Sequence, residues 1–576
     1  MEKRQFRVLY REFLFRLVDR DLLSSDARTD SNKLFGQFAT VLGLVGIFLA
    51  GLALTIENHR KSQAAILVDA WSVEHTLIAT TMLIIGLFGV LSWDSAFPDR
   101  RDVLVLTPLP LRARTIFLAK VASLASALSI AVLASSAAPG IVLPFVLVPH
   151  TYLPLEMLLS SEIYRGLAAY WITMFTAAAF ILCSLLVIQG IAAQFPRRIF
   201  LRLSAFLQMG ALCLLIGVYF LEPSFRTAQS LADPRNQQAL AWLPSYWFLG
   251  IFQQLRGAPM TQAHTTLVAL AERAWIGLAC ALAGSAVVYL LSYFRTLRKI
   301  VEEPDILPAP RRLNWLPRFG TSLNAAVEQF TIRTLFRSRQ HRLLLSFYCG
   351  IGFAILILFL KTPVAQVMAA RSATSGWRQV TLPLLASSFV ITCLWTLGIR
   401  AVFALPLDLR ANWIFRLCTS REPSEYFSAT RRAMYALVPI PLCLGFAAVF
   451  LSVWPWRPAV EHLAVLALTS MTLTELSLYG FQKIPFTCSY LPGKSNFHMR
   501  FLLFALLGLN AILWASDFER GALSNPTRYG EIIAVLCFAA VVARWRTQVR
   551  ARSEETRLLF EEEWAPVIVS LALNGD

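Results

Sequence analysis

Long apolar runs organise the chain, and each is close to the ~20 residues that a helix needs to cross a bilayer. The first run, at 38–56, reads FATVLGLVGIFLAGLALTI. Further runs lie near 76–93, 116–138, 166–190, 199–221 and 274–294, and a second series lies near 343–360, 380–404, 433–453, 459–480, 501–516 and 529–543. The pattern predicts an all-α, polytopic integral membrane protein with about twelve transmembrane helices.

One apolar segment, 139–163, is interrupted by prolines. Pro139, Pro144, Pro149 and Pro154 stand among its apolar residues. Proline removes a backbone donor and disturbs a helix interior. We therefore expect this segment to be an excursion on the outer face or a re-entrant segment rather than a clean span.

Composition narrows the class further. Of 576 residues, 56% are hydrophobic and 15% are charged, and the mean hydropathy is +0.57. A soluble domain carries about 25% charged residues, so the composition excludes a soluble globular enzyme and a disordered protein. It also disfavours an outer-membrane barrel, whose strands give only a weak hydropathy signal.

The charges indicate the orientation in the membrane. The formal net charge is +18, and no nucleic acid is expected as a partner, because membrane proteins collect Lys and Arg in cytoplasmic loops. With the N-terminus inside and the spans alternating, the inside segment 295–342 carries ten Lys and Arg, whereas the outside segment 139–163 carries none. The pattern predicts a protein of the cell (inner) membrane with both termini in the cytoplasm.

The two series of apolar runs resemble each other. After the second run the chain reads LPLRARTIFLAK (109–120), and after the eighth it reads LPLDLRANWIFRLC (405–418). Six spans in the first half give both halves the same orientation, so we expect two parallel six-helix repeats. Chance similarity between apolar sequences is the alternative.

Four regions follow from this division. The first six-span half occupies 1–300, a cytoplasmic linker with an interfacial helix occupies 301–342, the second half occupies 343–545, and a cytoplasmic tail occupies 546–576.

The N-terminal stretch has the spacing of an amphipathic helix. We expect it to lie in the membrane interface with its apolar side toward the membrane and its basic side toward lipid phosphates, either as a simple anchor or as a lever that moves with the bundle. The apolar positions are Phe6, Leu9, Tyr10, Phe13, Leu14, Leu17 and Val18. A weaker counterpart precedes the seventh run, with Leu323, Val327, Phe330 and Leu335.

The segment 93–117, between the second and third runs, combines a mixed-charge cluster with prolines and a basic helix start. A short rigid element of this kind suits docking of a partner protein, and a solvated turn is the alternative. The candidate docking residues are Asp99, Arg100, Arg101, Asp102, Pro110, Arg112 and Arg114, and the matching segment of the second half supplies Asp408, Arg410 and Asn412.

The pattern of residues 99–120 resembles that of the type-2 family of ATP-binding-cassette (ABC) exporter permeases. Leu243-Pro244-Ser245-Tyr246-Trp247-Phe248, before the sixth span, also resembles segments of that family. The resemblance implies six spans per half, an interfacial helix at 5–23 and a coupling helix at 107–117. It further implies a channel subunit driven by separate P-loop ATPase subunits, two of which would dock at 99–117 and 405–417. Such permeases are often single six-span chains that dimerise, whereas here two halves are fused.

An acidic residue, Glu475, lies within the tenth apolar run. An intramembrane charge costs a few kcal/mol unless it is paired or hydrated, so we expect Glu475 to pair with an arginine of another helix or to line a polar pathway. The other runs are nearly free of charge. That absence of a carboxylate relay disfavours a proton- or sodium-coupled transporter.

The sequence offers no catalytic, cofactor or metal-binding motif. CSYLPGKSN (488–496) ends like a phosphate-binding loop but has Cys488 where the signature needs glycine, so ATP hydrolysis is expected on a partner chain. The nine cysteines form no CxxC pair. His59 and His75 flank the first outer loop, which also holds Glu57, Asp69 and Glu74; a solvated loop is favoured there over a metal or catalytic site.

Three interpretations remain after these steps. The leading one is an exporter permease that is not itself an enzyme, contacts membrane lipids and exports a substrate that the sequence does not name. The second is a membrane enzyme acting on lipid-linked sugars, with Glu156, Glu162 and Asp233 as its candidate carboxylates. The third is a secondary transporter.

Overall fold

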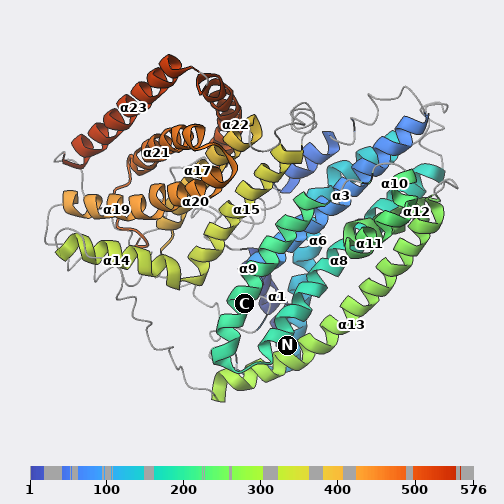
Figure 1. Ribbon diagram of the computed structural model, residues 1–576. Coiled ribbons are helices and arrows are strands. Elements are labelled where there is room, and N and C mark those ends of the chain that lie inside the picture. Colours follow the sequence, from blue (N-terminus) through green and yellow to red (C-terminus); the bar gives the residue numbers. More distant parts are fainter. Residues whose placement is uncertain are drawn as a thin grey trace. The chain divides into compact units, whose positions relative to one another are not determined.

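The structure is a computed structural model, and the chain divides into two compact units, Met1–Ala309 and Pro310–Asp576 (Figure 1). This division lies close to the expected boundary at 300. The described residues are 2–18, 42–51, 63–93, 111–147, 161–222, 228–257, 263–302, 322–361, 380–406, 423–487, 497–523 and 525–552, with a few isolated positions between them. Within these residues the secondary structure is helical throughout, with no strand, so the expected all-α class is confirmed.

The first unit is a bundle of long helices, and the short helices of residues 228–256 gather at one end of it (Figure 1). Its long helices are α3 (Gln63–Leu91), α6 (Ala113–Leu147), α8 (Ser161–Ala193), α9 (Arg197–Leu221) and α13 (His264–Glu302). Its shorter helices are α1 (Glu2–Val18), α10 (Ala228–Ala232), α11 (Pro234–Trp242) and α12 (Pro244–Arg256).

The second unit has the same order of elements with fewer short helices. It comprises α14 (Ser322–Arg337), α15 (Arg339–Lys361), α17 (Leu382–Phe403), α19 (Pro423–Leu437), α20 (Pro439–Val453), α21 (Trp456–Leu478), α22 (Phe497–Ala522) and α23 (Pro526–Arg552). The helices α19 and α20 form one apolar stretch that is interrupted at Val438.

Nine described helical stretches are long and apolar enough to cross a membrane, and a tenth follows if α14 and α15, bent by 75°, count as one. These stretches correspond to ten of the expected spans, so the polytopic membrane class is confirmed. The other two fall at a shorter apolar helix, Leu42–Gly51, and in α22. The total of twelve stays a prediction.

The proline-rich segment 139–163 differs from expectation. Helix α6 continues through Pro139 and Pro144 to Leu147, so the expected break is wrong for residues 139–147; residues 148–160 lie outside the described residues. Pro139 has no N–H for the Ser135 carbonyl. A Cβ added at Gly46 would lie 2.7 Å from that carbonyl oxygen. The short helix that contains Gly46 therefore packs closely against α6 at the point where proline interrupts its backbone hydrogen bonds. Such packing lets membrane helices run through proline.

Helix α12 occupies the core of the first unit. Its residues Phe248, Leu249, Ile251 and Phe252 are all at most 1% exposed, and it packs against α3, α8 and α13. Gly250 permits the approach to α13, because a Cβ there would lie 2.6 Å from the Leu267 carbonyl oxygen. The second unit has only residues 523–525 between α22 and α23, so this element distinguishes the two units.

The two units nevertheless share a packing pattern. In the first unit α1 packs on α6, α3 on both α8 and α9, and α8 on both α6 and α13. In the second unit α14 packs on α19, α17 on both α21 and α22, and α21 on α19, α20 and α23. These elements, matched in chain order, therefore share these neighbours.

Candidate functional site

The first predicted docking segment, 99–117, extends into the start of α6, and the second, 405–417, precedes α19 in the sequence. Arg112 is exposed, and its carbonyl accepts from the Thr115 amide at 2.9 Å, which starts α6. Arg114 is exposed in the first turn. The other candidate docking residues lie outside the described residues: Asp99, Arg100, Arg101, Asp102, Pro110, Asp408, Arg410 and Asn412.

Helix α1 is fixed to the beginning of α6. Leu9 and Phe13 are buried against Ala119 of α6, and the Tyr10 hydroxyl donates to Ser126 Oγ at 2.9 Å. The Lys120 ammonium lies 4.6 Å from the centre of the Phe13 ring, a cation–π geometry. We call α1 with residues 111–126 the first corner.

The contacts of α1 correct one expectation. Its apolar residues were expected to face the membrane, but Leu9, Phe13, Leu14 and Leu17 are at most 8% exposed because they pack on the protein. The exposed side of α1 carries the charges, including Lys3, Arg4, Arg7 and Arg11. The apolar side of the amphipathic pattern therefore corresponds to the contact of α1 with the helices of its own unit. The placement of α1 at the interface stays a prediction.

The second unit repeats this arrangement. Helix α14 packs on α19, which follows the second docking segment in the sequence. Ser428 Oγ donates to Asn324 Oδ1 at 3.3 Å, and the apolar contact consists of Val327, Tyr426, Ala429 and Ile484. We call α14 with residues 423–432 the second corner.

Glu475 ties three helices of the second unit together. It is 1% exposed. The Tyr435 hydroxyl of α19 donates to Oε1 at 2.9 Å, and the Thr547 hydroxyl of α23 donates to Oε2 at 2.7 Å. Arg431 Nε lies 3.4 Å from Oε1. Of the two roles considered for Glu475, these contacts describe pairing with an arginine of another helix.

A second buried carboxylate, Glu74, lies at the far end of the first unit. It is 1% exposed, accepts from the Gln253 amide, and pairs with Arg256 Nη1 at 3.2 Å. Arg256 Nη2 also donates to the Leu147 carbonyl at the end of α6, at 3.2 Å. The first corner and this ion pair therefore lie at opposite ends of α6, about 40 Å apart at 1.5 Å per residue.

The neighbouring His75 takes part in a second polar group. His75 Nε2 lies 3.1 Å from Glu222 Oε1, to which Ser245 Oγ also donates. The His75 ring stacks on Tyr246 at 3.9 Å between centroids, and the Tyr246 hydroxyl accepts from the Phe225 amide at 3.0 Å. The favoured interpretation of Glu74 and His75 as parts of a solvated loop is therefore wrong.

The sequence alone does not predict the partners of Glu74 and His75, because these partners lie in distant segments of the chain. Gln253 and Arg256 lie on α12, which no long apolar run predicts. One signal was present: Ser245, Tyr246, Gly250 and Gln253 share the apolar segment 243–256, and its polar members stand at positions that one side of a short helix would bury.

The second unit contains a buried serine–histidine–glutamate group. Ser388 Oγ lies 2.9 Å from His462 Nε2, and His462 Nδ1 lies 2.8 Å from Glu519 Oε1. All three are at most 2% exposed. The Ser388 hydroxyl also lies 2.7 Å from the Leu385 carbonyl oxygen, to which it can donate. Because all three side chains are buried among the helices, the group acts as a structural tie between α17, α21 and α22.

We expect Glu519→Gln to lower the free energy of unfolding by about 1.5 kcal/mol, because the amide keeps the shape but loses a charge-assisted hydrogen bond to His462. Thermal unfolding of the detergent-solubilised chain measures this. Asp517→Asn is the matched control on the same helix: Asp517 is exposed in its pair with Arg520, and its loss should change stability by less than about 0.5 kcal/mol. Equal effects of the two variants would refute the structural role of the tie.

Of the three carboxylates suggested for a membrane enzyme, the structure gives one a structural role. Asp233 caps α11 by accepting from the Arg235 amide at 2.9 Å, which is the usual function of aspartate at that position. Glu162 is exposed in the first turn of α8. Glu156 lies outside the described residues.

Within the described part of the chain, no group of three or more His, Cys, Asp or Glu side chains could hold a metal ion. Comparisons with protein-family models, with curated proteins and with solved structures find no match.

Proposed function

We propose that this chain is the membrane-spanning permease of an ABC-type exporter and that separate P-loop ATPase subunits drive it. The observation that carries the proposal is the repeated corner. In each unit, the helix that follows the predicted docking segment in the sequence is packed over its first turns by an amphipathic helix. A polytopic protein with two similar halves is also an architecture that many transporters share.

The corners explain how a cytoplasmic movement would reach the membrane. Leu9 and Phe13 are buried against α6, so a displacement of residues 106–112 moves α1 and α6 together rather than bending the chain between them. In the second unit, Ser428 and Val327 join α14 to α19 in the same way. Closure of two ATPases would therefore tilt both six-span units.

The few charges inside the units support an apolar or lipid-like cargo over a coupling ion. Glu475 and Glu74 are both paired with arginines in the structure, and paired carboxylates are poor proton carriers. The secondary-transporter alternative has no further observation in its favour.

The first experiment is a native pull-down. The chain is tagged at its C-terminus, solubilised gently, and its co-purifying proteins are identified by mass spectrometry. A protein with a complete P-loop, near two copies per chain, is expected. Recovery of the intact chain without an ATPase would contradict the proposal and favour the membrane-enzyme alternative.

Charge reversal at Arg100 and Arg101 should abolish ATPase association and leave membrane insertion intact, because two docking cations become anions. Co-purification with the ATPase and the membrane-fraction yield measure the two effects. Arg235→Glu is the control, since Arg235 is exposed on α11, a helix at the predicted outer face. Unchanged association in the Arg100/Arg101 variant would refute the docking assignment.

A further inference from the structure

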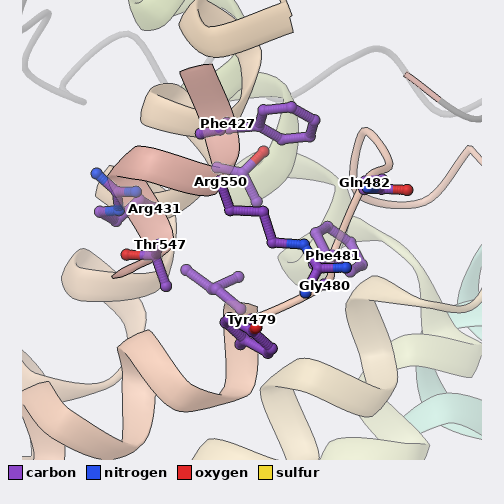
Figure 2. A pocket seen from close by; sticks show the side chains of 11 residues that line it. Phe427, Arg431, Tyr479, Gly480, Phe481, Gln482, Thr547 and Arg550 are labelled. Carbon is purple, nitrogen blue, oxygen red and sulfur yellow. The ribbon is translucent and has the colours of Figure 1, made fainter. Parts of the chain in front are cut away.

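A small pocket lies in the second unit where α19 begins and α21 and α23 end (Figure 2). Arg431 and Thr547 lie on one side of it, residues 480–482 lie on the other, and the Arg550 side chain extends between them. The lining residues that matter for its chemistry are Arg431, Tyr479, Gly480, Gln482, Thr547 and Arg550. Its volume is about 40 Å³.

The lining is positively charged. It contains two guanidinium groups and no carboxylate, since Glu475 lies behind Thr547 and accepts from its hydroxyl. Arg431 Nε lies 3.4 Å from Glu475 Oε1 and makes no hydrogen bond to the described residues. A guanidinium has five N–H donors in a planar fork that matches the oxygens of a phosphate or carboxylate. The pocket therefore suits an anionic group.

The surroundings place the pocket at the level of lipid headgroups. Trp545 and Tyr479 are 61% and 53% exposed, and exposed Trp and Tyr concentrate at membrane–water interfaces. On α23 the exposed apolar residues Phe538 and Val541 are followed by arginines 544, 546 and 550. This order is typical of a helix that leaves the hydrocarbon region and enters the headgroup region.

We propose that this pocket binds the phosphate of an anionic phospholipid from the leaflet at this end of unit 2, which the charge pattern assigns to the cytoplasm. The Arg431 Nη groups and Arg550 contact the phosphate oxygens, and Gln482 lies at the rim. A water needs about 10–15 Å³, so the pocket has room for about three waters. This space suits a phosphate group and is too small for an acyl chain. The acyl chains of the lipid would therefore lie along the exposed apolar surface of α23.

The stacking of Arg550 supports this assignment. Its guanidinium lies 4.7 Å from the centre of the Tyr479 ring, a cation–π contact that holds the charged group at the pocket. Gly480, with φ of 77°, makes the turn that brings Tyr479 and Gln482 to the same pocket. A side chain at this left-handed position would be strained.

The experiment uses the purified full chain in detergent. Dioctanoyl-phosphatidylglycerol, dioctanoyl-phosphatidylcholine and inorganic phosphate are titrated separately, and the rise in unfolding temperature gives an apparent affinity for each. We expect phosphatidylglycerol to stabilise the chain more strongly than the other two. Arg550→Gln should weaken its apparent affinity about tenfold, the effect of one charge-assisted hydrogen bond.

Arg546→Gln is the matched control, because Arg546 is an exposed arginine of the same helix that does not line the pocket. It should bind phosphatidylglycerol like the unmodified chain. Arg431→Gln should weaken binding too, but it also removes the cationic partner of Glu475. If the Arg431→Gln protein fails to fold, the result for Arg550→Gln alone tests the proposal.

Equal affinities of Arg550→Gln and Arg546→Gln would overturn the proposal, and so would equal stabilisation by phosphatidylcholine. Stabilisation by inorganic phosphate that Arg550→Gln abolishes would support the phosphate chemistry but assign it to a soluble ion instead of a lipid. None of these results depends on the ATPase, so the permease proposal can fail or succeed independently.

Discussion

Arg256→Ala is expected to destabilise the first unit by about 3 kcal/mol, because it leaves the Glu74 carboxylate buried without its cation. Glu74 is 1% exposed, and its other described hydrogen bond comes from the neutral Gln253 amide. The change also removes the bond from Arg256 Nη2 to the Leu147 carbonyl, which fastens α12 to the end of α6. Thermal unfolding in detergent measures the loss.

Two further variants separate the ion pair from general effects. Glu74→Gln in the Arg256→Ala background should recover part of the lost stability, because the uncompensated charge is gone. Arg273→Ala removes an exposed arginine of α13 and should change stability by less than about 0.5 kcal/mol. If Arg256→Ala behaves like Arg273→Ala, the pair does not stabilise the unit.

The sequence predicts the membrane class and most span positions because these depend on long, local apolar runs. Nine expected spans coincide with described long apolar helices, and a tenth coincides if α14 and α15 count as one span. The sequence also locates Glu475 as a charge within a span, since one carboxylate in an apolar run is a local signal. Its partners Tyr435 and Thr547 are 40 and 72 residues away, and no local pattern links them.

The errors share a physical origin. Helix α6 passes through Pro139 and Pro144 because a neighbouring helix packs against it, and helix α12 is buried although it is too short to span a membrane. Both depend on contacts between distant segments. The interpretation of Glu74 and His75 as solvated failed for the same reason, since α12 and the end of α9 cover them.

The amphipathic pattern of α1 shows a further ambiguity. A stripe of apolar residues on a basic helix fits a lipid surface and a protein surface equally well. The structure places Leu9, Phe13, Leu14 and Leu17 against protein. This result favours the lever over the simple anchor, because a helix held by α6 must follow the movement of α6.

Phe13→Ala tests the lever directly. Phe13 is 2% exposed and lies under the Lys120 ammonium, so its truncation opens a cavity between α1 and α6. Loss of a buried phenylalanine costs about 3–5 kcal/mol. Since that loss is local, we expect α1 to detach while the spans stay folded. If Phe13→Ala lowers the free energy of detaching α1 by about 3 kcal/mol, amide hydrogen exchange of residues 2–18 should become about 100-fold faster.

Val8→Ala is the matched control, because Val8 lies on the same helix and is 63% exposed. Its exchange should equal that of the unmodified chain. Exchange in α1 that Phe13→Ala leaves unchanged would show that the first corner is not held by this contact.

If the proposed ATPase partner is recovered, the same variant tests separately whether the ATPase binds and whether its movement reaches the membrane helices. Phe13 lies on α1, outside the predicted docking segment at 99–117, so Phe13→Ala should keep the ATPase bound. It should nevertheless uncouple ATP hydrolysis from the membrane units, since α1 no longer moves with α6. Substrate-stimulated ATPase activity of the complex should then fall toward its basal rate. Full stimulation with a detached α1 would show that the coupling segment acts on α6 alone and that α1 is an anchor.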